Sequence, residues 1–453
     1  MTVLQTFFST VCCRHLIQQL MRCILLVLDG LGDKGHACFG GKTPLQAAAT
    51  PNLDRLASLG MNGLYHSYLQ GTAMPSEIAH FLMFGYGLDE FPGRGLLEAM
   101  GEGIRIRDDE VYVLARIFSV KRKQELLILH HESPALDVKT CRTLQKAIKG
   151  YQHGAVAIEF IPTRGILGIL RLSGGVSAHI TDSNPMSEGR PLMEVLPVSG
   201  CEDRDKAHAT ARALNEYLRW CYRTLSKHPL NRERTRKGLL PGNAVGTQRP
   251  GMKRNLPSMN EKWGLRCLSI SSGPVYHGLC SLLGMENHRV AEKADPEKDL
   301  RHRLKLAREA TDFDFVHVHT KAPDEASHTK DPEHKKAVIE TLDRALDYAL
   351  DEIASDEDLL LVITADHSTA STGSMIHSGE TVPLTILGRY ARRDEVSAFN
   401  EVSCAGGSLG LVRGKELMYL ILNFLDRGKL WGTMDSPVNQ PYFPGRYRSL
   451  RIR

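Results

Sequence analysis

The fold is decided by the stretch CILLVLDG at residues 23–30, in which six apolar residues lead directly into a carboxylate. Two later stretches, FVHVHTKAPDEASH at 315–328 and LLLVITADHS at 359–368, follow the same plan. Val/Ile/Leu-rich runs are typical of strands that are buried on both faces of a parallel sheet. Ligands bind outside the carboxyl ends of such strands, so we expect an α/β fold whose polar strand ends form one site. The polar residues at these ends are Asp29, Asp324, His328, Asp366 and His367.

These side chains suit a metal site. Asp324 and His328 lie four residues apart, so one helical turn places both on the same face. His377, in the loop-like SMIHSGE at 374–380, supplies a further imidazole. Each Asp taken alone is better explained as a turn former or a helix N-cap. Taken together, oxygen and imidazole ligands without a nearby cysteine pair fit Mn, Zn, Mg or Fe.

The number of candidate ligands favours two ions over one. Six or seven protein ligands would leave no open position on a single catalytic metal. Metal pairs about 3.5–4 Å apart are common in phosphatases, nucleases and related phosphoryl-transfer enzymes. The ligand set therefore predicts chemistry on phosphate esters.

A candidate nucleophile, Ser76, stands in GTAMPSEIAHFLMFGY at residues 71–86. Pro75, followed by a helix-favouring run, predicts that Ser76 lies at or near a helix N-terminus. From the local sequence alone, a helix N-cap explains this serine better than catalysis does. A metal-bound hydroxyl beside the positive end of a helix would, however, ionise readily and attack phosphorus. We interpret His80, four residues on, as a packed helix residue rather than a catalytic one.

Longer motifs extend over most of the chain and come in a fixed order. They are LVLDGLGD, GGKTPLQAAATPNLDRLASLG, GRGLLEAMGEGI, ITDSNP, HPLNRERTRKGLLPGN, HVHTKAPDEASH, VITADHST, HSGETVPL and CAGGSLGLVRGKELM. In this order and at these separations the chain resembles the 2,3-bisphosphoglycerate-independent phosphoglycerate mutases. The archaeal-type branch of that family, within the alkaline phosphatase superfamily, is the most similar. Several long motifs in one order are far more specific than a single short pattern.

The resemblance implies an alkaline-phosphatase-like α/β fold, with a mostly parallel sheet sandwiched by helices and an inserted smaller α+β domain. Asp29 and Ser76 precede the other metal ligands by more than 200 residues. We therefore expect a discontinuous metal-binding domain at 21–105 and 263–453, with a substrate-handling insertion at 106–262.

Local patterns predict elements within these domains. GAVAIEF (154–160) and RGILGILRL (164–172) are expected to be strands, and residues 207–228 an amphipathic helix. Residues 333–354 space apolar side chains at helical intervals and are expected to form one helix covering the sheet. The Pro/Gly/Lys/Arg-rich LLPGNAVGTQRPGMKRNLP (239–257) is interpreted as a loop or hinge.

The resemblance also assigns roles to the site residues. One metal would be held by Asp29, Ser76, Asp366 and His367, and the other by Asp324, His328 and His377. Ser76 would be the phosphoryl acceptor, and Asp182 of ITDSNP a general acid/base for the glycerate hydroxyls. From the local sequence, an Asx-type turn before Pro185 explains Asp182 equally well. The implied reaction interconverts 3-phosphoglycerate and 2-phosphoglycerate through phosphoserine, with two divalent ions, manganese first and Zn, Mg or Fe as alternatives.

A phosphorylated carboxylate also needs basic partners, and Arg offers a two-pronged donor for its oxygens. Several candidates lie beside glycine, which lets the backbone approach an anion. For any one of them, a solvated surface charge explains the residue better than substrate binding does, so the prediction is for the group, with Arg249 and Arg232 first. The candidates are Arg94, Arg164, Arg232, Arg234, Arg249 and Lys321.

Two segments depart from the family pattern and leave alternative functions open. PSEIAH (75–80) has Glu where the family usually has Asp after the serine, and ITDSNPM (180–186) lacks an acid and a histidine. One alternative is therefore a metal-dependent phosphatase, or a phosphomutase acting on another small phosphorylated or phosphonylated acid. The other is a non-catalytic metal-binding regulator that retains the fold.

Composition agrees with a soluble cytoplasmic enzyme. The 453-residue chain exceeds the usual size of a single core, and its net charge of +5 makes no case for nucleic acid or a membrane. Ten scattered cysteines without CxxC spacing favour reduced thiols in the cytoplasm. Residues 1–20 lack a secretion-signal pattern and are interpreted as an extension. We expect a monomer.

Overall fold

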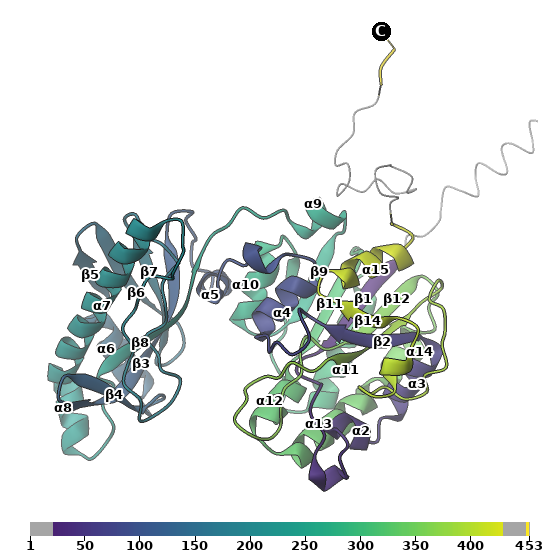
Figure 1. The fold of residues 1–453 in the computed structure, drawn as a ribbon, viewed down its shortest axis with the longest axis horizontal. Coiled ribbons are helices and arrows are strands. Elements are labelled where there is room, and N and C mark those ends of the chain that lie inside the picture. The colour runs from purple at the N-terminus through teal and green to yellow at the C-terminus, as the bar shows by residue number, and fades with distance from the viewer. Residues whose placement is uncertain (1–20, 429–449, 453) are drawn as a thin grey trace, which may run out of the picture. The chain divides into compact units, whose positions relative to one another are not determined.

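The computed structural model describes residues 21–428 and 450–452, which belong to two compact units (Figure 1). Unit 1 combines the segments Met1–Asp89, Pro257–Ser272 and Leu283–Arg453, and unit 2 combines Glu90–Leu256 and Gly273–Leu282. The extension expected at residues 1–20 lies outside the described residues.

Unit 1 is built on an eight-stranded sheet of order β10-β9-β11-β1-β12-β13-β2-β14. Its strands run in one direction except β13, which is antiparallel to both neighbours. The three strands predicted from the sequence, β1, β11 and β12, are adjacent, and nearly all of their residues are buried. The strands are β1 (Arg22–Leu28), β2 (Met61–His66), β9 (Cys267–Ser271), β10 (Glu286–Arg289), β11 (Phe315–Thr320), β12 (Leu359–Thr364), β13 (Val382–Leu387) and β14 (Gly410–Arg413).

Helices cover both faces of this sheet. Figure 1 shows α11, α13 and α3 on one side and α15 on the other. The α-helices of unit 1 are α2 (Pro44–Ala47), α3 (Pro51–Leu59), α4 (Ser76–Met83), α9 (Met259–Trp263), α11 (Pro296–Glu309), α12 (Ala322–His328), α13 (Pro332–Ala345), α14 (Asp347–Glu352) and α15 (Glu416–Phe424). Short 3-10 helices occur at η1 (Ala37–Phe39), η2 (Leu88–Glu90) and η3 (Cys404–Gly406).

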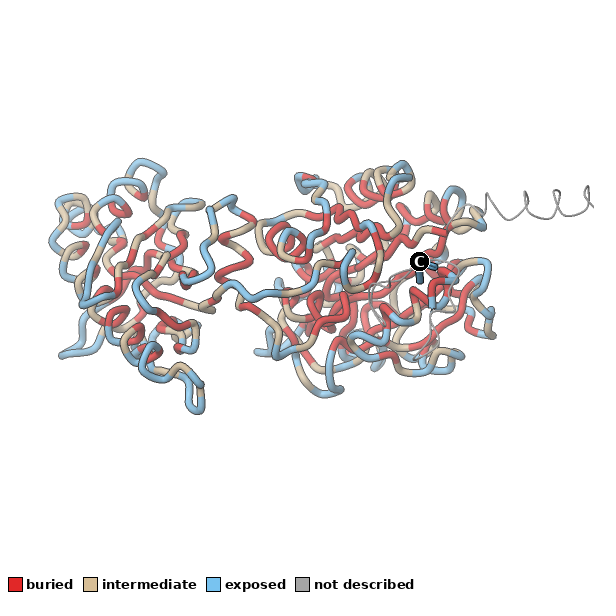
Figure 2. The backbone as a smooth tube through the Cα atoms, turned by 90° about the horizontal axis from the view of Figure 1, so that it is seen from above, coloured by how far each residue is buried: buried red, intermediate tan, exposed pale blue. Residues whose placement is uncertain are grey.

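Unit 2 contains an antiparallel sheet of order β4-β3-β7-β6-β5, in which β8 also pairs with β3. Its core joins strand residues such as Ile158 and Phe160 to Leu214 and Tyr217 of a long helix. Figure 2 shows buried stretches of backbone (red) inside the units and exposed ones (pale blue) at their outer loops. The strands are β3 (Val111–Lys123), β4 (Leu126–His131), β5 (Gly150–His153), β6 (Val156–Pro162), β7 (Leu167–Ser173) and β8 (Ala244–Met252). The helices are α5 (Arg94–Gly101), α6 (Val138–Ala147), α7 (Arg204–Lys227), α8 (Pro229–Arg236) and α10 (Pro274–Leu282). A mostly parallel sheet with helices on both sides, together with an α+β unit, confirms the predicted fold class.

The compact units are bounded differently from the expected domains, whose insertion ran from 106 to 262. Unit 2 already begins at Glu90, so it includes α5, and it also takes α10 from beyond the expected boundary. The reason is close packing of α5 on α10. A Cβ at Gly101 would lie 1.8 Å from the Pro274 carbonyl oxygen, and one at Gly278 would lie 1.7 Å from the Leu97 oxygen.

Strands β6 and β7 and helix α7 confirm three of the predicted elements, but the single helix expected over 333–354 is divided into α13 and α14. The division follows from a contact made by Arg301 of α11. Its Nη2 donates to the Arg344 carbonyl at 2.8 Å, and its Nη1 lies 2.6 Å from Asp347 Oδ1. The Arg344 carbonyl is thereby drawn into a contact outside its own helix just before the break at Leu346.

The loop or hinge expected over 239–257 is wrong for its central part, which forms strand β8. Pro250 is accommodated because the pairing with β3 shifts register between Tyr112 and Leu114. Arg249 has a φ of 51° at this shift. Such an irregularity places a residue without an N–H group where the ladder needs no donor.

No helix within the described residues combines the length and the apolar character needed to span a membrane.

Candidate metal centre and arginine pocket

The candidate metal centre lies in unit 1, at the carboxyl ends of the three central strands. Leu28 of β1 pairs with Thr320 of β11, and Val27 pairs with Thr364 of β12, so the three strands end close to the same level. Asp29 follows β1 directly, α12 begins two residues after β11, and Asp366 follows β12. The expected convergence of strand ends is therefore present.

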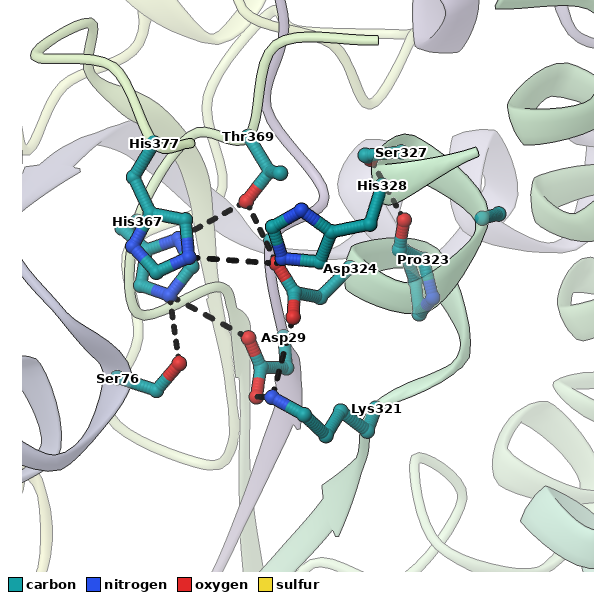
Figure 3. Close-up of polar contacts among 12 residues, drawn as sticks. Asp29, Ser76, Lys321, Pro323, Asp324, Ser327, His328, His367, Thr369 and His377 are labelled. Carbon is teal, nitrogen blue, oxygen red and sulfur yellow. Dashed lines mark hydrogen bonds and ion pairs between the residues drawn. The ribbon is translucent and has the colours of Figure 1, made fainter. Parts of the chain in front are cut away.

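The first ligand group surrounds His367. Its Nε2 lies 3.1 Å from Asp366 Oδ2, 3.4 Å from Asp29 Oδ1 and 2.9 Å from Ser76 Oγ. Ser76 is the first residue of α4, so it lies at the helix N-terminus as predicted, but the N-cap residue is Pro75 and not Ser76. All four side chains are buried. The arrangement places a hydroxyl, two carboxylates and an imidazole around one point. Figure 3 shows three of these side chains, those of Ser76, Asp29 and His367.

The second group surrounds Asp324, on α12. Asp324 Oδ1 lies 3.3 Å from His328 Nε2 and 3.6 Å from His377 Nε2. The ring of His377 stacks on that of His367, with 3.9 Å between centroids. The structure thus brings all seven predicted ligands together. It also shows that His367, which was predicted for the first group only, faces both groups.

The donor set fits divalent cations. Ligand atoms of Asp29, Asp366 and His367 all lie within 4.8 Å of one another, and those of Asp324, His367 and His377 do the same. Three buried carboxylates at one place need cationic partners, since an uncompensated buried charge is costly. Carboxylate oxygen and imidazole nitrogen suit Mn, Zn or Fe.

The charges of the centre shift one another's proton affinities. Burial opposes protonation of His367, but Asp366, Asp29 and Asp324 outweigh it and raise the pKa of His367 to about 9. Burial would raise the pKa of Asp366, but His367 and His80 hold that pKa well below its ordinary value. Without metal, the centre therefore holds a protonated His367 beside the ionised carboxylate of Asp366. A bound metal ion would take the place of that proton.

Lys321, predicted to bind substrate, borders both groups. Its Nζ lies 3.0 Å from Asp324 Oδ2 and 3.7 Å from Asp29 Oδ2. Burial alone would lower the pKa of Lys321, but Asp29 and Asp324 outweigh it and raise that pKa. Lys321 is therefore a fixed cation at the edge of the centre.

Two further histidines contact the ligand carboxylates. His319 Nε2 lies 2.9 Å from Asp29 Oδ2, and His80 Nδ1 lies 2.9 Å from the Ser76 carbonyl oxygen and 3.4 Å from Asp366 Oδ2. Our interpretation of the sequence left His80 as a packed residue and did not consider His319. A signal for His319 is present, because HVHT places two histidines inside a strand that is otherwise apolar.

Three predicted arginines line one cavity in unit 2. Arg94, Arg164 and Arg249 border a cavity of about 280 Å³, together with Arg116, which sequence reasoning missed. Glu98 lies 2.7 Å from Arg94 Nε, and Glu132 lies 3.1 Å from Arg116 Nη1. We call this cavity the arginine pocket. Its chemistry suits a carboxylate or a phosphate.

The remaining predicted residues of unit 2 do not line this pocket. Arg232 and Arg234 lie on α8, where Arg234 donates to the carbonyls of Leu240 and Ala135 at 2.9 and 2.7 Å. Asp182 accepts a hydrogen bond from the backbone N–H of Arg249 at 2.6 Å, so it borders a pocket residue. Burial raises the pKa of Asp182 above its ordinary value.

Comparisons with known proteins agree with this geometry. The profile of the Metalloenzyme superfamily matches residues 21–424. The 2,3-bisphosphoglycerate-independent phosphoglycerate mutase 2 of Methanocaldococcus jannaschii is 39% identical over 433 residues, which cover 94% of this chain and 98% of that protein. The corresponding mutase of Methanopyrus kandleri is 34% identical over 418 residues, which cover 90% and 97%.

Solved structures give the same result. The cofactor-independent phosphoglycerate mutase of Thermoplasma acidophilum has a TM-score of 0.62 and 30% identity, and covers 89% of this chain and 100% of its own. A protein from Pyrococcus horikoshii has a TM-score of 0.73 and 25% identity, with 91% and 99% covered. Similarity of this extent shows that the chain belongs to the archaeal-type 2,3-bisphosphoglycerate-independent phosphoglycerate mutases of the metalloenzyme superfamily.

Proposed function

We propose that the chain interconverts 3-phosphoglycerate and 2-phosphoglycerate, with Ser76 taking up and returning the phosphoryl group. The observation that carries this proposal is the position of Ser76 Oγ, at the first residue of α4 and 2.9 Å from His367 Nε2. A hydroxyl placed among buried carboxylates and an imidazole is a nucleophile that can be activated. The curated relatives named above are phosphoglycerate mutases.

The proposal includes two divalent ions, manganese first. Asp29, Ser76, Asp366 and His367 would hold one and Asp324, His328 and His377 the other, while His367 also faces the second group. When bound, the ions would neutralise the phosphate oxygens and lower the pKa of the Ser76 hydroxyl.

Groups of the chain itself would stabilise the transferring phosphoryl group. Because α4 begins at Ser76, its N-terminus would present backbone N–H groups and the positive end of its dipole to an anion bound there. Lys321 would donate to a phosphoryl oxygen from its place beside Asp324 and Asp29.

Recognition of the glycerate is proposed for unit 2. The arginine pocket would hold the carboxylate, and Asp182 would exchange a proton with the glycerate hydroxyls. The raised pKa of Asp182 brings its proton affinity closer to what a general acid needs near neutral pH. To return the phosphoryl group to the other hydroxyl, the enzyme must retain the glycerate and exclude water. We propose that the enzyme acts as a monomer in cytoplasmic glycolysis.

Ser76→Ala tests the assignment of the nucleophile. The variant should keep its fold and lose mutase activity by more than about 10³-fold, because no acceptor oxygen remains. Ser327→Ala is a matched control. Ser327, on α12, is also buried beside the centre, but its hydroxyl donates to the Pro323 carbonyl at 2.7 Å.

Acid-quenched wild-type enzyme should yield a tryptic peptide phosphorylated on Ser76 by mass spectrometry. Full activity in Ser76→Ala, or a phosphorylated residue elsewhere, would contradict the assignment.

A further inference from the structure

Lys335, in the first turn of α13, has a completely buried side chain that points at backbone rather than at solvent. Its Nζ donates to three carbonyl oxygens, those of Gly30 at 3.0 Å, Gly32 at 2.8 Å and Thr369 at 2.9 Å. An ammonium group has three N–H donors, so all of them are used by backbone.

The three carbonyls belong to the two loops that carry metal ligands. Gly30 and Gly32 follow Asp29 at the end of β1, and Thr369 follows His367 at the end of β12. These loops are more than 330 residues apart in the chain. One ammonium group on a third element therefore ties both loops together through residues that lie one to three positions after the ligands Asp29 and His367.

The same two loops have little freedom to adjust. The Gly30 N–H donates to Asp366 Oδ1 at 3.1 Å, and the Thr369 N–H donates to the Gly32 carbonyl at 2.9 Å. Thr369 Oγ1 donates to Asp324 Oδ1 at 2.9 Å and lies 3.1 Å from His367 Nδ1. A shift of either loop would therefore move ligands of both groups.

The buried charge of Lys335 has a partner that is separate from the metal ligands. Asp33 Oδ2 lies 3.3 Å from Lys335 Nζ and is also held by the backbone N–H of Ser371 at 3.1 Å. The carbonyl bonds and the carboxylate together compensate the cost of burying an ammonium group. Charge balance and loop fixation are thus two separable contributions of this lysine.

We propose that Lys335 is a positioning residue, which holds the Asp29 loop and the Asp366–His367 loop at the separation that metal binding requires. This inference rests on the proposed metal centre. Residues that orient metal ligands typically change metal affinity by about 10- to 100-fold when they are replaced. Lys335 touches no ligand side chain, and it acts through the backbone of the two loops.

The test compares Mn²⁺ dissociation constants by calorimetry for the full chain and for Lys335→Met, which keeps the length of the side chain without its donors. We expect the constant to rise by about 10- to 100-fold. In Lys335→Met the Asp33 carboxylate loses its cation. The double variant Asp33→Asn/Lys335→Met removes this unpaired charge as well, and its Mn²⁺ binding should be weakened by the same factor. If Lys335→Met alone does not fold, the double variant provides the test instead. Asp33→Asn alone should retain near-normal affinity, because the ammonium can still bind the carbonyls.

Arg427→Met is the matched control for loss of a buried cation. Arg427 is buried and pairs with Asp314 at 2.8 Å, just before β11 and so at the opposite end of the strand from the metal ligands. If Lys335 had only a structural role, Mn²⁺ binding would weaken equally in Lys335→Met and Arg427→Met whenever the two variants lose the same free energy of unfolding.

The outcomes separate this inference from the proposed function. Tight binding by the wild type and by Arg427→Met, with weak binding by both Lys335 variants, supports it. Unchanged affinity in the Lys335 variants, or recovery in the double variant, overturns the positioning role and leaves the metal centre intact. Absence of Mn²⁺ binding in the wild type overturns both.

Discussion

His367 is the residue on which the two ligand groups meet, and its protonation should control metal binding. A ligating imidazole must be neutral, so the ion has to displace the proton that the surrounding carboxylates stabilise. With a pKa of about 9, His367 is mostly protonated at neutral pH in the metal-free protein. A fall in pH increases the protonated fraction and so raises the dissociation constant.

We therefore predict that Mn²⁺ binding weakens by roughly tenfold for each pH unit below 9. Calorimetry at pH 6.5, 7.5 and 8.5 measures this, and two buffers of different ionisation enthalpy count the released proton. A dissociation constant that stays level across this range would contradict the electrostatic description of His367.

Gly30 provides a steric test of the same site. Its φ is 67°, and an added Cβ would lie 2.7 Å from Thr369 Oγ1 and 2.8 Å from Asp324 Cβ. Gly40 has nearly the same φ, 64°, but nothing lies within 4 Å of its added Cβ. Gly30→Ala and Gly40→Ala thus share the backbone strain, about 1–2 kcal/mol, and differ in the clash.

Both variants should lower the free energy of unfolding in urea, Gly30→Ala by the larger amount. We expect only Gly30→Ala to weaken Mn²⁺ binding, since it displaces Asp324. Equal binding by the two variants would show that the site tolerates movement of this loop.

The strand-end residues were open to prediction because their neighbours carry a strong local signal. Asp29 and Asp366 each follow an apolar run that is too regular to be a loop. Lys335 carries no such signal, since a lysine in a helix is ordinarily solvated. Its role depends on carbonyls more than 30 residues away, in loops whose proximity only the folded chain reveals.

At the scale of elements, α13 positions Lys335, and its N-terminus has a clear cap. Asp331 Oδ1 accepts from the backbone N–H groups of Glu333 at 3.0 Å and His334 at 3.3 Å. Asp331→Ala should lower the free energy of unfolding by about 1 kcal/mol, as loss of an N-cap does. Thr341→Ala, in the middle of the same helix, should change the free energy of unfolding by only a few tenths of the amount expected for Asp331→Ala. Urea denaturation of both variants measures the difference, and equal effects would contradict the capping role.

Elements were predictable where local composition decides them and not where distant partners do. Strands β6 and β7 and helix α7 follow their own periodicity. Strand β8 does not, because Pro250 and the glycines around it are typical of a loop, and only pairing with β3 makes the segment a strand. The division between α13 and α14 likewise depends on Arg301, which lies on a different helix.

At the scale of the whole molecule, the chain separates two kinds of chemistry. The metal-ligand candidates lie in unit 1, and the arginine pocket and Asp182 lie in unit 2. The spacing of the motifs predicts this division, because the ligands occur before residue 80 and after residue 320. The exact bounds were not predictable, since the assignment of α5 and α10 to unit 2 depends on how two helices separated by more than 170 residues pack.

The measurement that tests the central proposal most directly is a phosphorus NMR time course of the full chain with Mn²⁺ and 3-phosphoglycerate. We predict that 2-phosphoglycerate appears without added 2,3-bisphosphoglycerate, and that inorganic phosphate stays at the level of an enzyme-free control. Release of free phosphate in place of 2-phosphoglycerate would identify a phosphatase instead. An unchanged spectrum, from protein shown to bind Mn²⁺, would contradict the proposed activity.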